Sequence, residues 1–205
     1  MPNNQIIMSD FWIYFNYGLK HVLDIYAYDH VLFLLALTVP YDFKDWKRIL
    51  ILVSLFTLGH SLALLLSVFN ILILKVNIVE LIIPITILVT ALYNLITSGK
   101  SSKKDSITFV AFITVFFGII HGLGFASYFN TIANGKPTDK FIPLTEFALG
   151  IECSQIIVVI VVLCLSYMVQ TLFKFSKRDW TLTMSAFVLG IVIPMILQSE
   201  IWHIK

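Results

Sequence analysis

Four of the five histidines lie in or beside strongly apolar segments, where an ionisable side chain is costly and usually serves a function. They are His21, His30, His60 and His121. Acidic residues accompany them at Asp29, Glu146 and Glu152. Imidazole and carboxylate groups are suitable ligands for a divalent transition metal ion, so these residues predict a metal site if the fold brings them together.

Nitrogen and oxygen ligands without a thiolate suit zinc, nickel, cobalt, manganese or iron, and ligand type alone does not choose among these ions. Three imidazoles and one carboxylate would either close a tetrahedral site or leave one position open to water. Other polar groups should support the ligands through hydrogen bonds: Asp24, Ser61, Glu146 and Gln155.

The composition indicates which kind of fold must position these residues. Hydrophobic residues make up 59% of the chain and charged residues 13%, and the mean hydropathy is +0.91. This is too little polar surface for a soluble globule. Near-continuous apolar runs such as Ile49–Leu74 favour helices over the alternation of a β-barrel. We therefore expect an all-α, polytopic helix bundle in the lipid bilayer, forming a single integral membrane domain over residues 1–205.

The net charge of +2 is too small to indicate nucleic acid as a partner. About six spans of roughly 20 residues fit the length of the chain. An aromatic segment, Phe11–Leu23, predicts a shorter helix that lies at the interface or re-enters the membrane. The six expected spans are Tyr28–Pro40, Trp46–Asn70, Val76–Ile96, Ile107–Phe129, Phe141–Leu172 and Leu182–Gln198.

Basic residues in the loops predict the orientation of these spans. Nine of the fourteen basic residues follow the first, third and fifth spans. They are Lys44, Lys47, Arg48, Lys100, Lys103, Lys104, Lys174, Lys177 and Arg178. Because basic loops face the cytoplasm, both termini should lie outside it.

With this orientation, the position of a residue along a span gives its depth in the membrane. His21, Asp29 and His30 precede or open the first span, which starts at the outer side. His60 and His121 each come fourteen residues into an outward-going span, roughly 21 Å from the inner boundary. Glu146 and Glu152 come roughly 8 and 17 Å into the inward-going fifth span. Separate segments thus place their ionisable groups in one outer layer.

Simpler interpretations exist for each residue taken alone. A buried histidine often donates to a neighbouring carbonyl, Asp29 could cap a helix, and Glu146 could face the headgroups. Glu152 is harder to explain in this way, because it lies deep in an apolar run with Gln155 one turn further on. Several costly groups at one depth favour a shared site.

Several motifs occur in order between Gly18 and Gln155. They are His21-Val-Leu, Tyr28-Asp-His-Val-Leu-Phe-Leu-Leu-Ala-Leu37, Phe56-Thr-Leu-Gly-His-Ser-Leu62, Val79-Glu80, Phe117-Gly-Ile-Ile-His-Gly-Leu-Gly-Phe-Ala126 and Gly150-Ile-Glu-Cys-Ser-Gln155. With this pattern the chain resembles the HupE/UreJ group of bacterial membrane proteins. That resemblance implies a multi-pass protein of the bacterial inner (cytoplasmic) membrane that handles metal, as nickel permeases and accessory proteins of nickel enzymes do.

By matching motif, the resemblance also implies a ligand set, which consists of His21, Asp29, His30, His60, His121 and Glu152. One departure is visible. The family usually separates its first histidine from the Asp-His pair by five residues, whereas seven lie between His21 and Asp29 here.

Two mechanisms remain open from the sequence. In a permease for nickel or a related divalent ion, the outer ligands would strip a hydrated cation and the carboxylates would offset its charge during passage. In a membrane-embedded zinc-dependent hydrolase, the histidines would hold Zn²⁺ while a carboxylate activates its bound water. The inward halves of the second and fourth spans are almost wholly apolar, which suits a permease less well. A structural or sensing role for the metal is a third possibility, and transport is the function that we predict.

Overall fold

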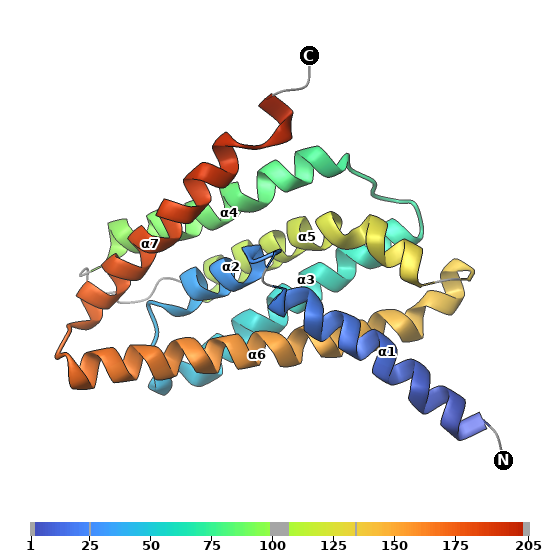
Figure 1. Cartoon of the computed structure of the whole chain (residues 1–205), viewed down its shortest axis with the longest axis horizontal. Coiled ribbons are helices and arrows are strands. Elements are labelled where there is room, and N and C mark those ends of the chain that lie inside the picture. The colour runs from blue at the N-terminus through green and yellow to red at the C-terminus, as the bar shows by residue number, and fades with distance from the viewer. Residues whose placement is uncertain (1–2, 25, 99–106, 134, 203–205) are drawn as a thin grey trace.

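The computed structural model describes residues 3–24, 26–98, 107–133 and 135–202, and within these ranges all regular structure is helical. Side chains are described from residue 11 to 24 and from residue 110 onward in the helices that begin at residues 3 and 107. The predicted all-α polytopic bundle is confirmed (Figure 1). The α-helices are α1 (Asn3–Leu23), α2 (Asp29–Thr38), α3 (Trp46–Val68), α4 (Val76–Thr97), α5 (Ile107–Ile132), α6 (Phe141–Leu172) and α7 (Lys177–Leu197).

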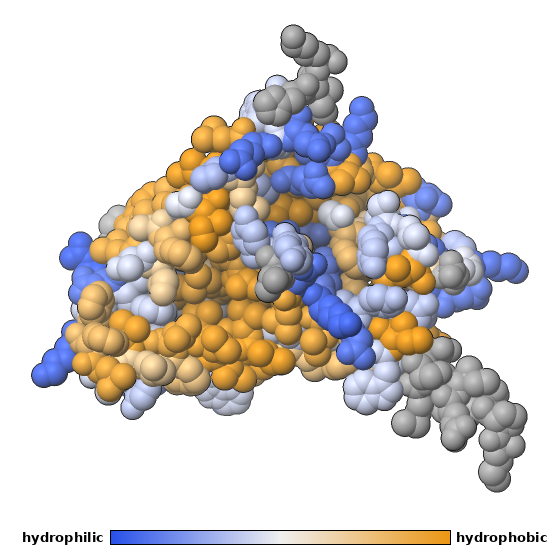
Figure 2. Space-filling model, viewed as in Figure 1, coloured by the Kyte–Doolittle hydropathy of each residue, from blue (hydrophilic) through white to orange (hydrophobic). Residues whose placement is uncertain are grey.

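Five of the described helices, α3 to α7, are long and apolar enough to cross a membrane. Their outward surfaces carry large apolar side chains, as the extensive hydrophobic surface in Figure 2 shows. Leu58, Ile96 and Phe112 are each more than 60% exposed, which a soluble protein would disfavour and a lipid bilayer accommodates. The bundle is therefore that of a membrane protein.

The N-terminal quarter differs from the predicted boundaries. The expected short helix Phe11–Leu23 begins at Asn3, and the expected span Tyr28–Pro40 contains only the ten-residue α2. A ten-residue helix is about 15 Å long, half the thickness of the hydrocarbon core. α1 ends and α2 begins near the middle of the bundle (Figure 1). Of the two positions expected for the N-terminal helix, the interface and a re-entrant segment, the arrangement favours the second, and α1 and α2 form one interrupted path into the molecule.

The remaining helices enclose this interruption. α3 packs along α5, α1 crosses α6, and α4 packs along α7, while α2 contacts α4, α6 and α7. Buried aromatic side chains from four helices fill the centre, and they include Phe33, Phe56, Phe129 and Phe147. The interior next to the helix break is thus tightly packed, and polar groups placed there are held in position.

Local signals define the start of α7. Ser176 Oγ accepts a hydrogen bond from the backbone N–H of Asp179, and the Asp179 side chain accepts one from the backbone N–H of Ser176. This reciprocal capping arrangement satisfies N–H groups that a helix leaves unpaired at its N-terminus. The basic residues Lys174, Lys177 and Arg178 lie at this end of the molecule, and Lys100, Lys103 and Lys104 lie outside the described residues.

Candidate metal site

The break between α1 and α2 brings the first two histidines together. His21 is the third residue from the end of α1, and His30 is the second residue of α2. Between them the chain turns at Asp24, whose carbonyl accepts from the N–H of Ala27 and whose side chain accepts from the N–H of Tyr26. The two imidazole rings consequently lie with their centroids 4.6 Å apart.

His60 and His121 come from α3 and α5, which approach closely because glycines line their contact. A Cβ atom at Gly59 would clash with the carbonyl oxygen of Val115, and one at Gly122 would clash with that of His60. At Gly118 it would meet the carbonyl oxygen of Phe56. Small residues on both helices thus let the two backbones touch, which brings the two histidines into the same buried layer.

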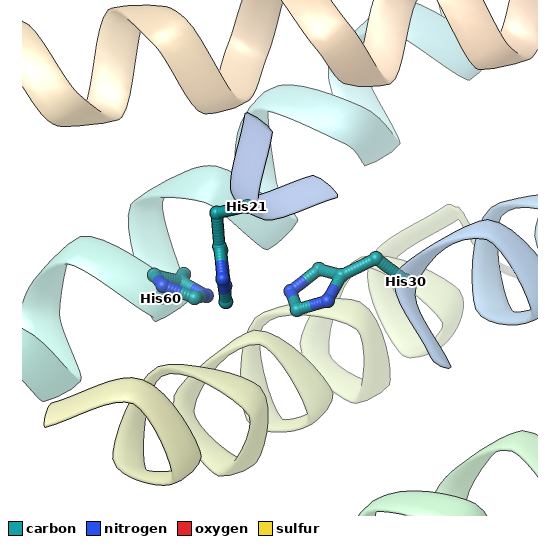
Figure 3. Close-up of side chains that lie close together, drawn as sticks. All are labelled: His21, His30 and His60. Atoms are coloured by element: carbon teal, nitrogen blue, oxygen red, sulfur yellow. The ribbon is translucent and has the colours of Figure 1, made fainter. Parts of the chain in front are cut away.

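Three of the histidines form a compact group, which we call the histidine cluster: His21, His30 and His60. One ring nitrogen from each lies within 4.8 Å of those of the other two. The rings come from α1, α2 and α3 and gather around a common space (Figure 3). Imidazole nitrogens bind metal ions at about 2.1 Å. Small rotations of these side chains would therefore place all three nitrogens on one ion.

His121 lies at the edge of the histidine cluster. Its ring centroid is 5.1 Å from that of His30, and its Nδ1 lies 2.8 Å from the carbonyl oxygen of Phe117 one turn earlier. Because a carbonyl only accepts, Nδ1 must be the protonated nitrogen and Nε2 carries the lone pair. His121 therefore offers one nitrogen to a ligand, with its ring orientation set by its own helix.

The ring nitrogens of the histidine cluster include several without a hydrogen-bond partner among the described residues. These are Nε2 of His21, Nε2 of His30 and both nitrogens of His60. His30 and His60 are almost completely buried. A buried polar atom without a partner costs free energy, and native proteins rarely tolerate several together. The donor set therefore fits a bound cation, which would satisfy all three rings at once.

Asp29 orients one of these rings. Its Oδ1 lies 3.1 Å from His30 Nδ1 and also accepts a hydrogen bond from the backbone N–H of His30. This contact places a proton on Nδ1 and leaves Nε2 available to a metal. In the structure Asp29 thus holds His30 instead of lying among the ring nitrogens of the cluster.

Glu152, on α6, belongs to a second polar group, whose hydroxyls lie one and two turns before His60 on α3. Its two carboxylate oxygens each lie 2.5 Å from a hydroxyl, those of Ser54 and Thr57. Thr57 Oγ1 is also 2.8 Å from the side-chain amide of Gln155. A hydroxyl has only one proton to donate, so an amide nitrogen of Gln155 turned toward Thr57 gives a consistent chain from Gln155 through Thr57 to Glu152.

The other predicted supporting residues lie around the histidine cluster in different ways. Asp24 is exposed and lines a cavity of about 610 Å³ together with Asp29 and Glu80, and Lys20 is the basic residue in its wall. Hydrophilic residues interrupt the apolar surface near the middle of Figure 2. Glu146 is buried on α6, and Ser61 is half-buried on α3. The cavity reaches His21, His30 and His121, so the cluster is accessible from it.

The sequence matches the family model described as HupE / UreJ protein over residues 2–203, nearly the whole chain. The chain belongs to the HupE/UreJ family. Neither the curated proteins nor the solved structures gave a match. Family membership implies that this protein handles metal, in agreement with the presence of a histidine cluster.

The unusual spacing in this HupE/UreJ protein does not separate His21 from His30. The seven residues between His21 and Asp29 comprise the last two residues of α1 and the connection that turns at Asp24. His21 remains 4.6 Å from His30 between ring centroids. The departure from the family spacing is therefore compatible with a site that includes His21.

Sequence reasoning missed the partners of Glu152 and most of the cavity wall. Thr57 lies three residues before His60, which puts both on one face of α3, and this spacing was the available signal. Ser54 precedes Thr57 by three residues on the same face. Glu80, on α4, lines the same cavity as Asp24, which depends on how α4 packs next to the helix break.

Proposed function

We propose that this protein is a permease for a divalent transition metal ion, nickel or a related cation such as zinc. The histidine cluster is the binding site for the cargo, and His121 is a further nitrogen ligand at its edge. The observation that carries the proposal is the meeting of three imidazoles from three helices, with unpaired ring nitrogens, at the point where α1 and α2 are interrupted.

The cavity next to the cluster supports capture of a cation. Among the described residues, its wall contains three acidic side chains, those of Asp24, Asp29 and Glu80, against one lysine, Lys20. A concave wall with an excess of negative charge raises the local concentration of cations. A hydrated ion drawn there would exchange water for imidazole at His21 and His30.

The second polar group supports passage beyond the cluster. Thr57 and Ser54 lie one and two turns before His60, roughly 5 and 9 Å along α3. Both contact the carboxylate of Glu152. In this proposal Glu152 is the ligand that the cargo meets after His60, and the hydroxyls of Ser54 and Thr57 are neutral oxygen ligands beside it. An apolar helix alone would offer no such continuation.

The interrupted helix also favours transport over hydrolysis. Discontinuous helices that meet at a buried ion site are characteristic of transporters, because their free ends line the binding site. A zinc hydrolase instead needs a carboxylate placed to activate a metal-bound water. Asp29 is engaged with His30, and both oxygens of Glu152 are engaged with hydroxyls. The contact of Asp29 suits the orientation of a metal ligand, and the contacts of Glu152 suit transfer of the cargo.

Uptake into proteoliposomes tests the proposal. Vesicles that contain the purified protein and a metal-sensitive dye should accumulate Ni²⁺, Zn²⁺, Co²⁺ or Mn²⁺ faster than protein-free vesicles. His30→Leu should abolish this uptake, because leucine fills a similar volume and cannot bind metal. Ser127→Ala, an exposed change on α5, is the matched control and should transport at the wild-type rate.

Two outcomes would contradict the proposal. A protein that binds metal at the cluster and transports none of the four ions is not a permease for them. Equal uptake by wild type and His30→Leu would show that the histidine cluster is not on the route.

A further inference from the structure

A second cavity lies at the opposite end of α2 from the histidine cluster. Its volume is about 490 Å³, and it lies where α2 and α4 end and α3 and α7 begin, on the left of Figure 1. Residues of all four helices and of the connection before α3 line it. Among them are Arg48, Lys177, Arg178, Asp45, Asn94 and Thr97.

The charge of this cavity is opposite to that of the cavity beside the histidine cluster. Among the residues that the structure describes, three basic side chains line it, against one acidic side chain, that of Asp45. Lys177 Nζ is paired with Asp42 Oδ2 at 2.8 Å, and Asp45 Oδ2 accepts from the backbone N–H of Asp42. Within the part of the chain that the structure describes, neither guanidinium has an ion-pair partner. The cavity therefore holds an excess of positive charge.

Arg48 is the lining residue whose surroundings indicate most directly that an acceptor binds in the cavity. Its guanidinium stacks on the ring of Tyr41, 5.3 Å from the centroid, which restricts how the group can turn. Its Nε atom is buried and has no hydrogen-bond partner among the described residues. A buried donor in a charged group is costly when unpaired, so an acceptor bound in the cavity would complete this arrangement.

The neutral polar side chains in the described wall do not supply that acceptor, since none of them is hydrogen-bonded to Arg48 Nε. Two of them are held by their own helix or a neighbour: the Asn94 amide donates to the carbonyl of Ala36, and the Thr97 hydroxyl donates to that of Tyr93. The N-terminus of α7 is capped by the Ser176 hydroxyl and the Asp179 carboxylate, so the positive charge here comes from the basic side chains. An occupant must therefore be an acceptor of several charge-assisted hydrogen bonds, and phosphate oxygens match a guanidinium in geometry and charge.

The level of the cavity relative to the membrane favours a lipid as the source of phosphate. Trp46 begins α3 beside the cavity and is 52% exposed, and Lys47 lies over its ring. Tyr93 lines the cavity and is 40% exposed. Exposed tryptophan and tyrosine are typical of the headgroup region. Basic pockets between helices on the cytoplasmic side, where this end is predicted to lie, bind the headgroups of anionic lipids.

We propose that this cavity binds a phosphate-class oxyanion, which Arg48 and Arg178 hold and which an anionic phospholipid headgroup supplies. The proposal is independent of the metal permease, because no residue of the histidine cluster lines this cavity. Bound lipid would join the ends of α2 and α4 to the beginnings of α3 and α7, and would stabilise the bundle at this end.

Native mass spectrometry and thermal unfolding of the intact purified protein test the proposal in three arms. The probes are phosphatidylglycerol, phosphatidylcholine and inorganic phosphate. Phosphatidylglycerol should be retained and should raise the unfolding temperature, and phosphatidylcholine should do so less.

Arg48→Gln and Arg178→Gln should each weaken phosphatidylglycerol binding by roughly tenfold or more, the effect of losing one charge-assisted contact. Inorganic phosphate should protect only weakly; protection as strong as that of the lipid, lost in the same variants, would assign the cavity to free phosphate and overturn the lipid source.

Matched variants distinguish lipid binding in this cavity from a general attraction of anionic lipid to the basic end of the protein. Lys44→Gln and Lys47→Gln remove exposed positive charges from the same end and should leave phosphatidylglycerol binding close to wild type. Arg48→Lys keeps the charge but removes the planar fork, and it should bind less tightly while folding normally. Equal loss in the lysine and arginine variants would overturn the proposal, as would unchanged binding in Arg48→Lys and Arg178→Gln.

Discussion

At the scale of single residues, His60 is the most informative position. It is fully buried, neither ring nitrogen has a partner among the described residues, and His21 and His30 lie beside it. His60 should therefore lower the free energy of unfolding of the metal-free protein and raise that of the metal-bound protein. The sequence identified His60 as unusual because of its apolar surroundings, but its unpaired state depends on packing that only the fold supplies.

His60→Leu is expected to separate these two effects. Without metal, its unfolding temperature should equal or exceed that of wild type, since the substitution removes unpaired buried nitrogens worth about 1 kcal/mol or more. With Ni²⁺ or Zn²⁺ at a hundred times the wild-type dissociation constant, wild type should gain about 2.7 kcal/mol and the variant almost nothing. Thermal unfolding with and without metal measures both. An equal gain in the variant would exclude His60 as a ligand.

Glu152→Gln is expected to affect transport more than binding. Both carboxylate oxygens contact hydroxyls rather than the histidine cluster, so equilibrium affinity for the first metal ion should change by less than about threefold, under 1 kcal/mol. Uptake into proteoliposomes should fall by about tenfold or more, because the next charged ligand has lost its charge. Isothermal titration and uptake assays on the same preparation check the two parts. A loss of affinity as large as that of His60→Leu would instead make Glu152 a ligand of the initial site.

At the scale of elements, close helix contacts and one interruption build the site. Apolar runs in the sequence were sufficient to predict α3 to α7 with small errors at their ends. The break between α1 and α2 lies where the expected helix Phe11–Leu23 and the expected span Tyr28–Pro40 are separated in the sequence. Its position inside the bundle could not be predicted, because it depends on how α1 packs against α6. Gly18 and Gly150 make that contact close, since each lies against the backbone of the other helix.

Gly122→Ala is expected to disturb the site through this kind of contact. The added methyl group would meet the carbonyl of His60 and would lie 2.8 Å from Ala63 Cβ, so α3 and α5 must separate. Overpacking of this kind costs about 1–3 kcal/mol, and displacement of His60 should also weaken metal binding. Gly190→Ala is the matched control, since nothing lies within 4 Å of its added Cβ, and it should be neutral or slightly stabilising. Thermal unfolding and metal titration of both variants test this. Equal behaviour would show that the α3–α5 contact does not hold the site.

At the scale of the whole molecule, the two cavities differ in charge across the bundle. The first cavity joins acidic residues to the histidine cluster, and the second cavity gathers basic residues at the end that the loop charges predict to be cytoplasmic. Composition was sufficient to predict a membrane bundle, and depth counting was sufficient to predict that the histidines share a layer. Which of them meet could not be predicted, because that depends on how α1 enters the bundle.

A metal-loaded structure with anomalous scattering at the absorption edge of the bound ion tests the central claim most directly. We expect one strong anomalous peak among His21, His30 and His60, within about 2.1 Å of a nitrogen from each, and loss of this peak in His60→Leu. A peak located only elsewhere, such as beside Glu152, or no peak in folded protein saturated with Ni²⁺ or Zn²⁺, would contradict the assignment of the histidine cluster as the cargo site.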